Sequence, residues 1–110
     1  MPTSNLFSAV PNLSQGEQFE TLLRHRNVVI ERIVSTSDIE PQLYVQEQDE
    51  WVALLQGRAQ IEMGETEIEL NAGDTLFIPA QTPHKVLSTS ANPQCIWLTV
   101  HIFSEPKAEG

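Results

Sequence analysis

Apolar and polar residues alternate along much of this chain, and that period of two is the pattern of half-buried β-strands. In residues 58–63, three apolar side chains share one face and three polar side chains share the other. Turn residues such as Gly57, Gly64 and Gly73 separate the apolar stretches. We therefore predict strands over residues 28–34, 42–46, 51–55, 58–63, 66–70, 76–78, 84–88 and 95–103.

The segment before residue 28 shows a different spacing. Phe19, Leu22 and Leu23 lie at positions i, i+3 and i+4, which places them on one face of a helix. A serine and a glutamate three positions apart precede them in the spacing of a capping box. The pattern predicts one short helix over residues 15–25.

This order of elements indicates an all-β domain with one short N-terminal helix. Many short strands separated by turns are typical of a sandwich or a barrel. The length of 110 residues suits a single domain with one core. We expect an arm and helix over residues 1–27, a barrel over residues 28–103 and a tail over residues 104–110.

Charge and composition exclude several classes of function. Fifteen acidic and six basic residues give a net charge of −9, which argues against nucleic acids and anionic membranes as partners. The single cysteine, Cys95, rules out an internal disulfide and fits a buried apolar position in a reducing compartment. The N-terminus lacks the pattern of a signal peptide, and no apolar run approaches the ~20 residues of a membrane helix. We expect a cytoplasmic protein.

The stretch from Gly73 to His84 carries the first candidate chemistry. Its apolar run, Leu76–Ile78, predicts a buried strand that ends at Pro79, because proline has no N–H to donate to a neighbouring strand. Pro83 stiffens the loop that follows, and His84 begins the next strand. This arrangement would hold one histidine at the mouth of a β scaffold, where binding sites are often built.

These residues resemble the two conserved motifs of the cupin family. The glycine, the proline and the histidine of residues 73–84 are similar to the second motif, and Glu50, six residues and Gly57 are similar to the end of the first. The resemblance covers roughly residues 28–103. It implies a double-stranded β-helix, which is a barrel of the jelly-roll type.

In cupins, three histidines and one glutamate of these motifs bind a divalent metal. Glu50 and His84 match two of the four ligands, whereas Tyr44 and Gln46 stand where the first motif has its two histidines. An amide oxygen and a phenol are weaker ligands for first-row metals than imidazole. The resemblance therefore implies a metal site that is degenerate at two positions.

Two interpretations of the site follow. In the first, His101 shares a face of the last strand with Trp97 and adds a ligand, so that a tentative set binds Zn, Fe, Ni or Mn. In the second, the same residues form a polar pocket without a metal, in which a glutamate facing a histidine can support acid–base chemistry. The tentative metal ligands are Gln46, Glu50, His84 and His101, and the pocket adds Tyr44 and Trp97.

Three functions remain open at this point. The chain could be a metal-dependent enzyme such as a dioxygenase, isomerase or lyase, or a module that binds a small molecule without catalysis. It could also serve in assembly as a homodimer, with Leu6, Phe7 and Val10 of the arm at the contact. Within residues 28–34, Arg32 is expected either as an exposed or rim-paired arginine, or as a cation at the pocket mouth for an anionic ligand.

Overall fold

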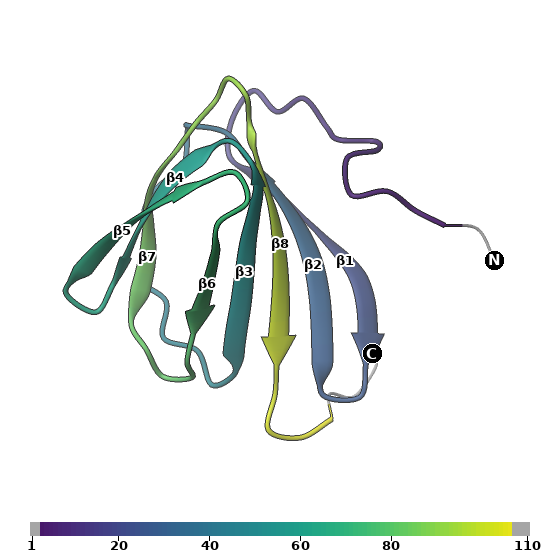
Figure 1. Ribbon diagram of the computed structural model, residues 1–110, viewed down its shortest axis with the longest axis vertical. Helices are drawn as coiled ribbons and strands as arrows, with labels where there is room; N and C mark the ends of the chain where they lie inside the picture. The colour runs from purple at the N-terminus through teal and green to yellow at the C-terminus, as the bar shows by residue number, and fades with distance from the viewer. Residues whose placement is uncertain (1–2, 107–110) are drawn as a thin grey trace.

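The computed structural model describes residues 3–106 and shows eight strands in two antiparallel sheets (Figure 1). The larger sheet has the order β1-β2-β8-β3-β6 and the smaller has the order β5-β4-β7. The all-β fold predicted from the pattern is confirmed, as is the pair of facing sheets that the cupin resemblance implies. None of the residues from 3 to 106 forms a helix long and apolar enough to cross a membrane. The strands are β1 (Glu17–His25), β2 (Val28–Ser35), β3 (Asp49–Gln56), β4 (Arg58–Met63), β5 (Thr66–Asn71), β6 (Thr75–Ile78), β7 (His84–Thr89) and β8 (Cys95–Ile102).

The predicted helix over residues 15–25 is wrong, because Glu17–His25 is a strand that pairs antiparallel with β2. The register shifts between Thr21 and Leu23, which leaves Leu22 as an extra residue in a β-bulge. The bulge breaks the period of two and produces the spacing that resembled a helical face. Pairing with β2, which is rich in β-branched residues, then outweighs the weak local preference of this segment for a helix.

The strand predicted over residues 42–46 is also wrong. Tyr44 forms only an isolated bridge with His84, in which each backbone N–H donates to the other residue's carbonyl at 2.8 and 3.0 Å. The bridge nevertheless holds the segment against the edge of β7, so that Tyr44 lies beside the start of that strand.

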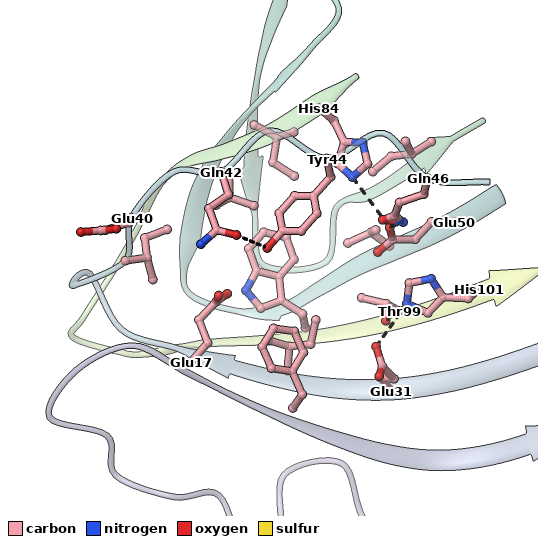
Figure 2. A pocket seen from close by; sticks show the side chains of 18 residues that line it. Glu17, Glu31, Glu40, Gln42, Tyr44, Gln46, Glu50, His84, Thr99 and His101 are labelled. Carbon is pink, nitrogen blue, oxygen red and sulfur yellow. Dashed lines mark hydrogen bonds and ion pairs between the residues drawn. The ribbon is translucent and has the colours of Figure 1, made fainter. Parts of the chain in front are cut away.

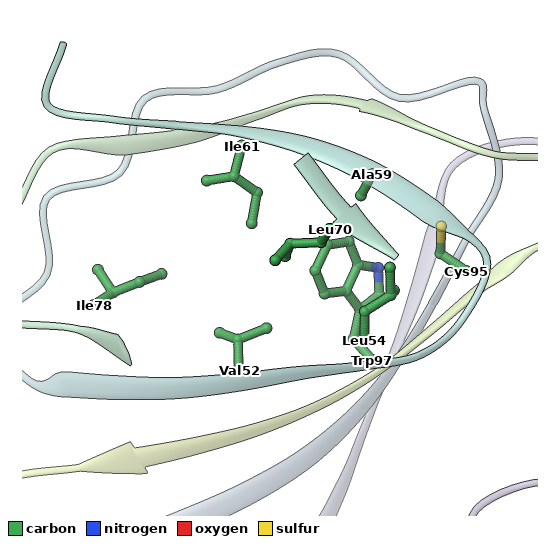
Figure 3. Packing of buried hydrophobic residues seen from close by; sticks show 8 residues of the cluster. All are labelled: Val52, Leu54, Ala59, Ile61, Leu70, Ile78, Cys95 and Trp97. Carbon is green, nitrogen blue, oxygen red and sulfur yellow. The ribbon is translucent and has the colours of Figure 1, made fainter. Parts of the chain in front are cut away.

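The apolar core lies between the two sheets (Figure 3). Leu54 of β3 and Trp97 of β8 are partners across the larger sheet, and both are buried. The Trp97 indole N–H donates to the Ser35 hydroxyl at 3.1 Å, which satisfies its one polar atom. Cys95 is fully buried, as predicted. The cluster comprises Val52, Leu54, Ala59, Ile61, Leu70, Ile78, Cys95 and Trp97.

Arg32 is neither exposed nor among the residues that line the cavity between the sheets, and it is paired as one alternative expected. Its side chain is buried, and its guanidinium donates to the backbone carbonyls of Leu6, Ser8 and Ala9. It also pairs with Glu20 of β1 at 2.7 Å. Arg32 does not line the main cavity between the sheets. It therefore fastens the N-terminal arm to the larger sheet.

Candidate functional site

A cavity of about 260 Å³ lies between the sheets, next to the core. Apolar side chains such as Ile33, Val52 and Ile78 form much of its wall. The structure brings all six residues that the sequence proposed as pocket residues to this one cavity. They are Tyr44, Gln46, Glu50, His84, Trp97 and His101.

Glu50 and His84 reach the cavity from opposite sheets. Glu50 is the second residue of β3, where residues 50, 52 and 54 all point inward. His84 is the first residue of β7, as the proline-bracketed loop predicted. His84 Nε2 lies 3.9 Å from Glu50 Oε1, and both residues are buried. A carboxylate and an imidazole thus face each other at one end of the cavity.

The loop before β7 determines which nitrogen of His84 faces the cavity. Nδ1 lies 2.9 Å from the carbonyl oxygen of Thr82, and a carbonyl can only accept, so Nδ1 carries a proton. In the neutral ring Nε2 is then an acceptor, and this is the atom that faces Glu50. The Tyr44 ring stacks on the imidazole, with 5.8 Å between ring centroids.

Glu50 is a carboxyl group in a poorly solvated position. The Gln46 side-chain amide donates to Glu50 Oε1 at 3.0 Å. Burial raises the pKa of Glu50 above its ordinary value of 4.5, although His101 and His84 oppose this effect. Glu50 and His101 are cross-strand partners of β3 and β8, which places their side chains on the same face of the sheet.

His101 belongs to a second imidazole–carboxylate pair. Its Nδ1 lies 3.1 Å from the side-chain amide nitrogen of Gln48, which can only donate, so Nδ1 accepts. Its Nε2 then carries the proton and lies 3.2 Å from Glu31 Oε1 and 3.5 Å from Thr99 Oγ1. The two histidines that line the cavity are therefore held in opposite tautomers.

Glu31 and Gln48 were not identified from the sequence. The alternation of residues in β2 could have indicated Glu31, because it lies on the same face of the strand as Val29 and Ile33. Ile33 also lines the cavity. A carboxylate on the inward face of an apolar strand needs a partner, and His101 provides it. Gln48 precedes β3, in a polar run whose pattern does not reveal which side chain turns inward.

The donor set that the cupin resemblance implies is not present in this cavity. Gln46 directs its amide N–H, not its oxygen, toward Glu50, and both nitrogens of His101 have hydrogen-bond partners. Within residues 3–106, no three histidine, cysteine, aspartate or glutamate side chains are arranged to hold a metal ion. Since the residues present do not fit the metal, we assign no chemical step to it.

The charges around the cavity are unbalanced. Four glutamates line it, and neither a lysine nor an arginine is among its lining residues in the described chain. Figure 2 shows these carboxylates in two groups, with Glu31 and Glu50 at the end that holds the histidines and Glu17 and Glu40 beyond Tyr44. A ligand in this cavity therefore meets negative potential at both ends.

Comparisons with known proteins agree with the fold. The family model described as a cupin domain matches residues 33–101, which is more than half of the chain. A proposed mannose-6-phosphate isomerase from Ralstonia eutropha JMP134 is 33% identical, with 94% of this chain and 100% of that chain covered and a TM-score of 0.83. A cupin superfamily protein from Desulfitobacterium hafniense DCB-2 is 19% identical, with 94% and 95% covered and a TM-score of 0.80. No curated protein matches the chain at a significant level.

The family match over residues 33–101 includes both motif residues, Glu50 and His84. The eight strands form the two facing sheets expected of that barrel. The chain is a small single-domain member of the cupin family.

Proposed function

We propose that this cupin binds a small polar molecule, uncharged or positively charged, in the cavity between its sheets. The observation that carries the proposal is the pairing of Glu50 with His84 at the end of an otherwise largely apolar cavity. Ligand sites commonly combine apolar walls with a few placed polar groups. The volume of about 260 Å³ suits a molecule smaller than most drugs.

Each polar group offers the ligand a defined role. His84 Nε2 accepts a hydrogen bond when the ring is neutral, because its Nδ1 proton is directed to Thr82. Glu50 accepts as a carboxylate and can donate when it is protonated. The exposed ring of Tyr44, stacked on His84, would cover a ligand at this end. Hydroxyl and amine groups fit these partners.

The lining charges narrow the class of ligand. A phosphorylated ligand would face four glutamates without a lysine or arginine among the described lining residues to balance it. We therefore do not carry over to this chain the phosphorylated substrate in the description of the Ralstonia relative. An amine would gain from the same carboxylates, and a neutral polyol would avoid the repulsion.

Thermal shift with a matched panel tests the proposal. Each scaffold is offered as a neutral sugar, as its amino sugar and as its 6-phosphate, once with chelator and once with Zn, Fe, Ni or Mn added in its place. A ligand that binds only the folded state stabilises it by RT ln(1 + [L]/Kd), so the melting temperature rises with ligand concentration. We expect hits from the neutral or amino members, and we expect the shift to disappear in His84→Ala. Hits confined to the phosphates, or stabilisation that needs Zn, Fe, Ni or Mn, would contradict it.

Catalysis by Glu50 and His84 is the second candidate, and the raised pKa of Glu50 favours it. A carboxyl that keeps its proton nearer neutral pH, opposite an imidazole, can donate a proton while the imidazole accepts one. Such an enzyme would move protons, as an isomerase or a lyase does. Turnover of a ligand found by the thermal-shift panel, lost in Glu50→Gln while binding remains, would support it. The metal-dependent alternative requires bound metal, which elemental analysis of untagged protein would detect.

A further inference from the structure

The cavity continues past Tyr44 into a second hollow at the surface. This hollow has a volume of about 330 Å³, and five residues line both it and the cavity. They are Glu17, Ile39, Glu40, Gln42 and Tyr44. We call this hollow the mouth groove. A ligand longer than the cavity therefore has room to extend into the mouth groove, past the ring of Tyr44.

The mouth groove is acidic, and backbone hydrogen bonds bring its carboxylates together. The Gly16 N–H donates to the Asp38 carbonyl at 2.9 Å, and the Thr36 N–H donates to the Gly16 carbonyl at 3.1 Å. These bonds hold the start of β1 beside the loop that follows β2. The groove is lined by Glu17, Asp38 and Glu40, with neither a lysine nor an arginine among its described lining residues. Within the described chain, these three carboxylates form no ion pair.

Glu17 is the carboxylate that would gain most from a bound cation. The residue is exposed at the surface, yet partial desolvation of its carboxyl group raises its pKa above the ordinary value of 4.5. Figure 2 shows its side chain pointing toward Gln42 and Tyr44, where the groove joins the cavity. A positive charge at this position would replace the lost hydration of the carboxylate.

The inner end of the cavity lacks a hydrogen-bond donor. His84 and Glu50 are only 7% and 8% exposed, and His84 Nε2 lies 3.9 Å from Glu50 Oε1, which is too far for a hydrogen bond. Both atoms are acceptors when the ring is neutral and the carboxyl group is charged. None of the described residues donates to His84 Nε2. A primary ammonium carries three N–H donors and a positive charge, so one such group can satisfy both acceptors.

We propose that the ligand of this cupin is an aliphatic diamine that spans the cavity and the mouth groove. One ammonium lies between His84 and Glu50, and the other lies among the three carboxylates of the groove. The methylene chain between them packs along the apolar wall of the cavity. The inference rests on the proposed function, because it names the class of ligand for the same cavity. A neutral ligand or a monoamine gains from only one of the two ends.

Calorimetric titration of the full chain at low ionic strength tests the inference. The probes are 1,4-diaminobutane, 1,6-diaminohexane and 1,8-diaminooctane, each compared with the alkylamine of the same length. We expect at least one diamine to bind about five- to tenfold more tightly than its monoamine, and added salt to reduce this ratio. The ratio should fall toward one when Glu17→Gln, Asp38→Asn and Glu40→Gln are combined. Glu67→Gln, an exposed carboxylate on β5 outside both hollows, is the matched control and should keep the ratio.

Two results would overturn the inference and leave the proposed function standing. One is equal affinity for every diamine and its monoamine, or no amine binding at all, while neutral sugars still bind. The other is a preference for the diamine that the triple variant retains. If neither the amines nor the sugars bind, the proposed function fails and this inference fails with it. Circular dichroism checks the fold of the triple variant, and each single substitution should lower the ratio if the combination does not fold.

Discussion

Glu50 shows how one residue links the stability of this fold to its chemistry. It is a carboxyl group that the β-strand period turns inward, where water solvates it poorly. The hydrogen bond from Gln46 and the nearby imidazoles only partly offset the free-energy cost of burying this carboxylate, since the pKa of Glu50 is still raised. Residues that destabilise the fold and yet face a cavity are typical of functional sites.

Glu50→Gln should make the protein more stable at neutral pH. The native pKa of Glu50 lies above its ordinary value of 4.5, so the native state holds this proton to higher pH than the unfolded state does. The stability that protonated Glu50 contributes is therefore fully present below the pKa of this group in the unfolded state. That stability is lost as the pH rises through the pKa of Glu50 in the native state. Glutamine keeps the shape, and its amide can accept from Gln46 and donate to His84 Nε2.

Urea unfolding between pH 4 and pH 8 measures this effect. We expect the variant to exceed the wild type near pH 7 and the difference to shrink toward pH 4. Glu69→Gln, on an exposed position of β5, is the control and should show no such trend. A wild type that is the more stable protein at pH 7 would mean that the pairing with His84 outweighs desolvation.

At the scale of elements, the turn between β3 and β4 decides how the two sheets meet. Gly57 connects them with a φ of +94°, in the left-handed region that side chains rarely adopt. A Cβ placed there would lie 2.7 Å from Ser90 Oγ, 2.8 Å from Cys95 Sγ and 3.1 Å from Cys95 Cα. The turn is therefore restricted by backbone conformation and by packing together.

Gly57→Ala should be much more destabilising than Gly73→Ala. Gly73 has a similar φ of +97° but open space around its Cβ position, so it isolates the cost of backbone strain. We expect a loss of about 1 kcal/mol for Gly73→Ala and about 3 kcal/mol or more for Gly57→Ala. Chemical denaturation measures both. Equal losses would show that packing against Ser90 and Cys95 adds nothing.

The arm is a second element, held at residues 6–9 by Arg32 and at residues 11 and 13 by Gln94. Arg32→Ala removes the donors to the carbonyls of Leu6, Ser8 and Ala9, and hydrogen bonds from a charged group are among the stronger ones. We expect a loss of about 2 kcal/mol and faster amide hydrogen exchange across residues 6–9. Arg58→Ala, at an exposed position on β4, should change neither. Unchanged exchange in Arg32→Ala would mean that other contacts hold the arm.

β1 is the strand whose secondary structure could not be predicted correctly from the sequence. A single extra residue, Leu22, converts alternation into the spacing of a helix, and only pairing with β2 distinguishes the two. The other strands that the structure contains were predicted to within a few residues, because turns bracket them, although the β3–β8 and β4–β7 pairs also contain register shifts. Long-range pairing is not encoded in local spacing, which is why β1 was missed and why residues 42–46 were overpredicted.

At the scale of the whole molecule, the motifs indicated the fold more strongly than the chemistry. The spacing of Glu50, Gly57 and His84 was enough to expect the barrel, and the family match bears this out. The partners of those residues were harder to foresee, since Glu31 and Gln48 reach His101 from distant segments. The fold thus brings two imidazole–carboxylate pairs to one cavity whose walls also contain apolar side chains and two further glutamates.

Crystallography with anomalous scattering, on protein incubated with Zn and Fe, tests the central claim most directly. We predict that Glu50 and His84 face each other across the end of the cavity, that His84 Nδ1 donates to Thr82, and that no anomalous peak lies between the pair. A peak within coordination distance of both side chains, about 2.0–2.2 Å for zinc, would contradict the claim that this cupin binds its ligand without a metal.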